Sequence, residues 1–135
     1  MKIKLDNGAY MPEYAHGTDA GADLRSPHDA VVMPRGSVVV DTGVHIELPP
    51  DSVGMLKSKS GLNMKGLQSE GVIDVGYVGS IKVKLYNHGD KPYEVKAGDK
   101  ISQLVIMPVI HQPFELVDEL EDTERGDNGF GSTGR

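Results

Sequence analysis

The chain has 135 residues with a formal net charge of −6; it contains 17 glycines and 8 prolines, and neither cysteine nor tryptophan. This length predicts one domain, and the absence of cysteine excludes disulfides and thiolate zinc sites. The negative charge argues against binding of polymeric nucleic acid, which needs a basic surface. It is compatible with a single nucleotide held by local positive charge and a metal.

No apolar run approaches the ~18 residues of a membrane span, so no membrane contact is expected. Residues 1–15 lack the continuous apolar stretch of a signal peptide. A chain without cysteine suits a reducing compartment. We therefore expect a cytoplasmic protein.

Short apolar stretches recur between turn residues, at 30–33, 38–40, 44–48, 81–86, 93–95 and 101–109. Several alternate apolar and polar residues, which is the pattern of half-buried antiparallel strands. Frequent glycine and proline leave room for only one short helical window, at 60–65. We find no internal repeat. These strands predict an all-β sandwich, jelly roll or small barrel.

The stretch 71–79 reads GVIDVGYVG and places Asp74 in an apolar, hairpin-like segment bracketed by glycines. An acid there either forms a turn with its own backbone or is a positioned carboxylate. Tyr77 is either a packing residue or the wall of a small pocket.

Three other polar positions are weak signals when taken alone. The loop 58–62 carries Lys59 and exposed amides that suit phosphate oxygens, although ordinary connections look the same. Ser60 lies in no nucleophile motif, and the five histidines lack zinc-ligand spacing. Asp23 stands at a strand entry of small residues, and Gln103 stands among apolar neighbours.

The C-terminal segment 125–135 reads RGDNGFGSTGR and follows an acidic stretch that we interpret as a solvated linker. So many glycines prevent the segment from folding alone. It is either a disordered terminus or a strap that closes over a ligand with a ring and phosphates. Its G-x-G-x-x-G spacing lacks the strand and helix of a dinucleotide fold. We expect a barrel domain over 1–117 and a linker with a lid over 118–135.

The segments AGADLRSP, SKSGL, GVIDVGYVG, AGDKISQLV and RGDNGFGSTG occur in this order between Ala20 and Arg135. This ordered set closely resembles the five motifs of the homotrimeric deoxyuridine triphosphatases (dUTPases). The resemblance implies a jelly-roll-like distorted β-barrel subunit in a threefold trimer. It also implies hydrolysis of dUTP to dUMP and pyrophosphate with Mg2+, each site being closed by the tail of a neighbouring subunit.

The resemblance also assigns roles to residues. Asp74 would orient the attacking water, Tyr77 would pack on the deoxyribose, and Asp23 would reach Mg2+ through water. Phosphate contacts would come from Lys59, Ser60, Gly61 and Gln103. Uracil would be read mainly by backbone groups of the hairpin, with contacts from Gln68, Gly71, Val72, Ile73 and Lys82. From the tail, Phe130 would stack on uracil, and the β- and γ-phosphates would be held by Arg125, Gly131, Ser132 and Thr133.

The chain departs from the family's pattern at a few positions. Lys59 stands where arginine is usual, which keeps the positive charge but loses the bidentate hydrogen bonding of a guanidinium group. Gln68 stands where many bacterial members have asparagine, and the Asp127-Asn128 pair adds negative charge near Arg125.

Two alternatives share the resemblance. A dCTP deaminase or bifunctional relative would need a glutamate as general acid and base, and Glu70 does not sit in that enzyme's motif. Some dUTPases also bind a repressor protein and act as nucleotide-sensing regulators. Several of these carry an insert between the last two motifs, and residues 110–124 show none.

Overall fold

The computed structural model describes residues 1–134. Its only helix in that range is α1 (Ser60–Asn63). The strands are β1 (Lys2–Leu5), β2 (Gly21–Arg25), β3 (Ala30–Val32), β4 (Ser37–Asp41), β5 (Val44–Glu47), β6 (Ser52–Lys57), β7 (Leu67–Ile73), β8 (Lys82–Asn87), β9 (Tyr93–Val95) and β10 (Lys100–Pro108). The expected all-β, jelly-roll-like fold is confirmed.

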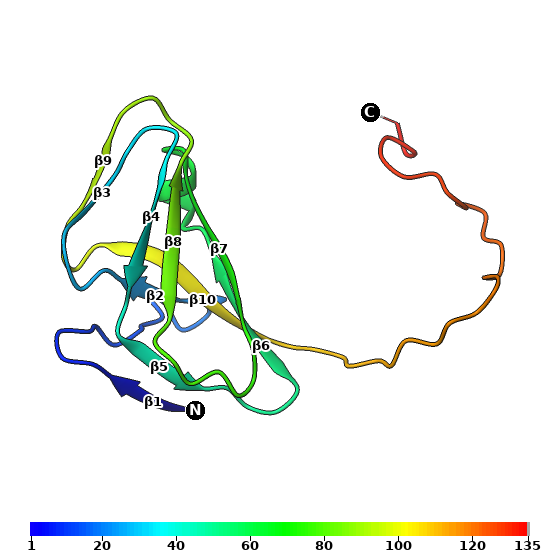
Figure 1. The fold of residues 1–135 in the computed structure, drawn as a ribbon, viewed down its shortest axis with the longest axis horizontal. Coiled ribbons are helices and arrows are strands. Elements are labelled where there is room, and N and C mark those ends of the chain that lie inside the picture. The colour runs from blue at the N-terminus through cyan, green and yellow to red at the C-terminus, as the bar shows by residue number, and fades with distance from the viewer. Residues whose placement is uncertain (135) are drawn as a thin grey trace.

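One large sheet has the strand order β2-β10-β6-β7-β8-β4 and curls into a half-barrel (Figure 1). Two small sheets, β1-β5 and β3-β9, complete the body. All pairings are antiparallel. Strand β10 lies between β2 and β6, so residues of these three strands, which are far apart in the sequence, lie side by side.

The core is aliphatic, and its largest fully buried side chains include Leu24, Leu56, Leu67, Ile81, Leu85 and Ile101. Strand β8 shows how the sequence builds it, because Val83 and Leu85 point inward while Lys82 and Lys84 face solvent. Full burial of each such aliphatic side chain contributes about 1.5–3 kcal/mol.

Most of the predicted elements are present in the structure. The stretches at 30–33, 38–40, 44–48, 81–86, 93–95 and 101–109 correspond to β3, β4, β5, β8, β9 and β10, and the helical window to α1. Strands β2 and β7 were anticipated only in part, by the strand entry around Asp23 and the hairpin-like segment 71–79, and the sequence patterns did not predict β1 or β6.

The chain leaves the barrel directly after β10 and runs outward as an extended arm (Figure 1). The Val109 N–H donates to the Asp51 carbonyl oxygen (2.9 Å), and every residue of 110–134 is exposed. The boundary at 117 stays a prediction. Within 1–134, no helix has the length and apolar character needed to cross a membrane.

Candidate active site

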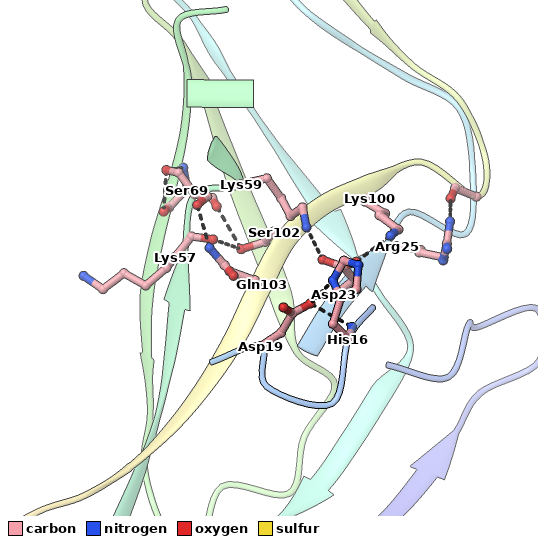
Figure 2. A network of polar contacts seen from close by, with 12 residues as sticks. His16, Asp19, Asp23, Arg25, Lys57, Lys59, Ser69, Lys100, Ser102 and Gln103 are labelled. Carbon is pink, nitrogen blue, oxygen red and sulfur yellow. Dashed lines mark hydrogen bonds and ion pairs between the residues drawn. The ribbon is translucent and has the colours of Figure 1, made fainter. Parts of the chain in front are cut away.

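Strand β10 brings three of the five motifs together. Its Gln103 lies opposite Asp23 of β2 and opposite Lys57 of β6. The Gln103 amide Nε2 donates to the Ser58 carbonyl oxygen (3.0 Å), just before Lys59 (Figure 2). Gly21 leaves room for this side chain, because a Cβ at that position would lie 2.6 Å from the Gln103 Oε1. The predicted residues Asp23, Lys59 and Gln103 are therefore neighbours.

Asp23 is the buried charge of this group, with only 3% of the residue exposed. Its Oδ1 contacts the Lys59 ammonium, and its Oδ2 lies 2.6 Å from the Lys100 Nζ, an ion pair without hydrogen-bond alignment (Figure 2). Burial opposes ionisation of the carboxyl, but the close contacts and positive charges of Lys100 and Lys59 outweigh it and lower the pKa of Asp23. Two partly exposed lysines around one carboxylate leave a net positive charge, which suits phosphate.

Replacing Asp23 with Asn should lower the free energy of unfolding at pH 7 by about 1–3 kcal/mol, since a buried charged hydrogen-bonding partner is lost. A lowered carboxyl pKa stabilises the fold above the unfolded-state value near ~3.9, and this contribution disappears as pH falls towards the folded-state pKa. The difference in unfolding free energy between wild type and Asp23→Asn should therefore shrink at acid pH. Urea titrations at neutral and acid pH measure this difference. Asp118→Asn, in the exposed arm, is the control and should match wild type.

A layer of serines fixes the loop that precedes α1. The Ser69 and Ser102 hydroxyls lie 2.8 Å apart, and the Ser102 hydroxyl also donates to the Lys57 carbonyl oxygen (3.1 Å) (Figure 2). The Ser69 N–H donates to the Ser58 hydroxyl (2.9 Å). These bonds hold β7 against Lys57 and Ser58, and Ser60 and Gly61 follow, exposed, at the start of α1.

The third motif forms the end of β7 and the turn that follows it. The Tyr77 N–H donates to the Asp74 carbonyl oxygen (3.1 Å), and Gly76 supplies the positive φ of +91° that this turn needs. The Asp74 side chain is exposed and makes no hydrogen bond within the described residues. The Tyr77 hydroxyl donates to the Ser80 carbonyl oxygen (2.9 Å), and its ring covers Gly79, where a Cβ would lie 2.6 Å from that hydroxyl.

The remaining hairpin residues lie on β7 and β8. Gly71 is opposite Leu56, whose side chain fills the space that a Cβ would take, and Val72 and Ile73 follow it to the end of β7. The Gln68 Oε1 accepts a hydrogen bond from the His88 Nε2 (2.9 Å). Lys82 starts β8 on the exposed face.

Within a single subunit, Asp74 lies far from the group formed by Asp23, Lys59 and Gln103. Ser69 sits beside Ser58 at one end of β7, whereas Asp74 follows the other end, five residues on. At about 3.3 Å per residue this is about 17 Å along the strand. The structure therefore does not bring Asp74 to Lys59 and Gln103 of the same chain.

The tail residues gather around a hollow of their own, lined by Arg125, Gly129, Phe130, Gly131, Ser132 and Thr133. The Arg125 Nε donates to the Asn128 carbonyl oxygen (2.8 Å). Phe130 is fully exposed (112%). All hydrogen bonds of 110–134 in the described chain stay within the arm, so the predicted lid residues are apart from the barrel.

The described residues contain no group of three side chains that could cage a metal. Asp23 offers one carboxylate, and both its oxygens face lysines. This donor set does not fit direct binding of an ion by the protein. It fits an Mg2+ ion that is held chiefly by the phosphates of a nucleotide and keeps its water.

Comparison with known proteins agrees with this arrangement. The dUTPase family model matches residues 7–134. Proteins described as deoxyuridine 5'-triphosphate nucleotidohydrolases from Gloeothece citriformis and Alkaliphilus metalliredigens are each 45% identical over 99% of this chain, which covers 97% and 96% of theirs. The dUTPase of Staphylococcus bacteriophage 80alpha, solved with dUPNHPP, superimposes with a TM-score of 0.92 at 33% identity, over 99% of this chain and 98% of that one.

A further solved structure is a mutant dUTPase from phage phi11 of S. aureus, described as showing the coordination of a structural Mg(II) ion. It has a TM-score of 0.82 at 30% identity, over 90% of this chain and 98% of that one. The fold and motif set thus define an all-β nucleotidohydrolase. The chain belongs to the dUTPase family, as the five motifs predicted.

Proposed function

We propose that this protein hydrolyses dUTP to dUMP and pyrophosphate. The observation that carries the proposal is full-length similarity to named dUTP nucleotidohydrolases, with all five motifs in place. The test is pyrophosphate release from dUTP, dTTP, dCTP and UTP in the presence of Mg2+. Only dUTP should be turned over efficiently. Ammonia release from dCTP would instead support the deaminase alternative.

The catalytic step we infer is attack by water on the α-phosphorus. The Asp74 carboxylate is exposed at a hydrogen-bonded turn, where it can accept a hydrogen bond from the water and aim it. No covalent intermediate is needed, because positioning and charge neutralisation are sufficient for phosphoryl transfer.

The phosphates would lie against the group formed by Lys59, Ser60, Gly61 and Gln103. Lys59 would exchange part of its contact with Asp23 for a phosphate oxygen. A lysine makes this contact as a point charge, without the bidentate hydrogen bonds that an arginine could donate. Bound Mg2+ would neutralise phosphate charge, with Asp23 holding one of its waters.

The nucleoside would lie between the hairpin and the tail. The Tyr77 ring would pack on the deoxyribose and exclude a 2′-hydroxyl, while backbone groups of 68–82 would read uracil. The lid would be the tail, with Phe130 stacked on the base and the outer phosphates held by Arg125, Gly131, Ser132 and Thr133.

We further propose a homotrimer whose sites are shared between subunits. Asp74 and Lys59 lie at opposite ends of β7, and the tail points away from its own barrel, which supports a site completed by other subunits. Strand β7 and the turn after it also expose large apolar side chains, Val72, Val75 and Val78. A threefold ring is a common closed symmetry that would cover them.

Mixing two inactive variants tests the shared site. Coexpressed chains, one carrying Asp74→Asn and one ending before Arg125, should regain activity. A complete site would draw Asp74 from one subunit and the tail from another. Random equal mixing would then restore about one quarter of wild-type sites. No recovery in mixed trimers of verified composition would show that the site lies within one chain.

A second candidate function is binding of a repressor protein. The 80alpha structures are described as phage dUTPases that control transfer of virulence genes by a G protein-like mechanism. Their similarity to this chain, at a TM-score of 0.92, favours testing it. Pull-down of a candidate repressor with and without dUpNHpp would show whether the nucleotide controls binding.

A further inference from the structure

The loop of residues 74–81 carries Asp74 and Tyr77, and its far end is firmly anchored. The Thr42 hydroxyl donates to the Ile81 carbonyl oxygen (2.6 Å), and the Ile81 N–H donates to the Val44 carbonyl oxygen (2.8 Å). The Ser80 hydroxyl bonds the Asp41 carboxylate. The turn between β4 and β5 therefore fixes the part of the loop that enters β8.

From outside the loop, the side chain of His45 of β5 contacts its middle. Its ring Nδ1 lies 2.8 Å from the Val78 carbonyl oxygen, and its Nε2 lies 3.0 Å from the Asp6 carboxylate Oδ2. The Val78 carbonyl oxygen and an ionised Asp6 carboxylate only accept hydrogen bonds, so both ring nitrogens can donate to them only when the ring is an imidazolium ion. Val78 directly follows Tyr77, and β5 lies beside the loop between β7 and β8 (Figure 1).

The charges around this ring favour its proton. Lys4 of β1 lies opposite His45, and its ammonium is 3.6 Å from the Asp6 Oδ1. Lys2 and Glu47 form a separate ion pair on the same small sheet (3.3 Å). The hydrogen bonds to Asp6 and to the Val78 carbonyl, with the charge of Asp6, outweigh desolvation and the opposing charge of Lys4, and they raise the pKa of His45 above 6.5.

We propose that protonated His45 is a positioning residue that holds Val78, and through it Asp74 and Tyr77, in the geometry that catalysis requires. The inference rests on the proposed dUTP hydrolysis. A neutral ring keeps only one N–H. The carboxylate of Asp6 is the stronger acceptor and retains it, so the Val78 carbonyl oxygen loses its donor. The link is thus complete at low pH and is lost as pH rises through the raised pKa of His45.

The first test is the pH profile of kcat/KM for dUTP, measured over roughly pH 5.5 to 9, which spans the titration of a perturbed histidine. The kcat/KM of wild type should fall about three- to tenfold as His45 deprotonates, which is the range for the loss of one hydrogen bond. His45→Ala should give a profile without this step, near the high-pH level of wild type. His45→Gln keeps a donor that does not titrate and should also remove the step. Asp6→Asn should move it to lower pH.

The matched control is His28→Gln. His28 is an exposed histidine between β2 and β3 whose Nδ1 contacts the Asp29 carbonyl oxygen, and its replacement should leave the step in place. A step of unchanged midpoint and size in His45→Ala would overturn the proposal, as would an unshifted midpoint in Asp6→Asn.

A second readout is independent of catalysis. NMR titration of the His45 ring should show the same midpoint as the amide shifts of Val78 and Gly79, and Asp6→Asn should lower both. If the amides do not follow the ring, the link is refuted whatever the kinetics. If wild type hydrolyses no dUTP at any pH, the proposed function fails, and the NMR result still decides whether His45 controls the loop.

Discussion

The Asp74→Asn variant should lower kcat for dUTP hydrolysis by at least ~10²-fold, the lower range for a positioned acid or base. Asparagine has nearly the shape of aspartate but lacks the negative charge that orients a water and accepts its proton. The turn should survive, because it depends on the Asp74 carbonyl oxygen and on Gly76, and not on the carboxylate. Thermal unfolding and oligomeric state should therefore match wild type.

The control for this variant is Asp90→Asn. Asp90 is also exposed and lies in the turn beyond the other end of β8, so the substitution makes the same charge change away from the loop. Its steady-state kinetics should be unchanged. Near-normal turnover in Asp74→Asn would remove the proposed role. Equal losses in both variants would point to net charge as the cause.

Ending the chain before Arg125 should leave a folded protein whose kcat/KM falls by roughly 10²- to 10⁴-fold. Stacking of a base on an aromatic ring is worth about 1–3 kcal/mol, and a charged hydrogen bond to phosphate is worth about 1.5–3 kcal/mol. The truncation removes both Phe130 and Arg125. Stability should not change, because residues 110–134 are exposed and form no hydrogen bond with the barrel.

Single substitutions separate the ring from the rest of the tail. Phe130→Ala should reproduce the stacking part of the loss, seen mainly as weaker binding of dUpNHpp by calorimetry. Phe114→Ala is the matched control, since this is the chain's other phenylalanine and is similarly exposed (105% against 112%). Equal losses from the two variants would contradict a specific stacking role for Phe130.

The sequence predicted strands where one face is buried and the ends are marked by turns. Strand β8 alternates cleanly between inward and outward residues, so its pattern is visible without a structure. Strand β6 was missed because Gly54 interrupts it. That glycine is needed, since a Cβ there would lie 3.0 Å from Leu104 and 3.1 Å from Ile73. Strand β1 was missed because it is largely exposed and pairs only with β5.

The candidate site was predicted through its ordered motifs, but its internal contacts were not. The pairing of Asp23 with Lys100 depends on the register between β2 and β10, which joins residues far apart in sequence. A buried acid needs a cationic partner, and that rule could have drawn attention to Lys100, at the start of the long apolar strand β10. The contact between the Ser69 and Ser102 hydroxyls could not be predicted in this way, because nothing in the sequence distinguishes these two serines from other serines in strands.

The arm of residues 110–124 sets how far the tail can extend, whereas the contacts to a ligand are assigned to residues of the tail itself. Residues 110–124 are exposed and form no hydrogen bond with the barrel, so we expect their length to set mainly the local concentration of Phe130 at a site. Doubling the length of a flexible tether costs only about 0.6 kcal/mol, less than a threefold change in that concentration. Segments could therefore be gained or lost here during evolution while the barrel and the closing residues stay the same.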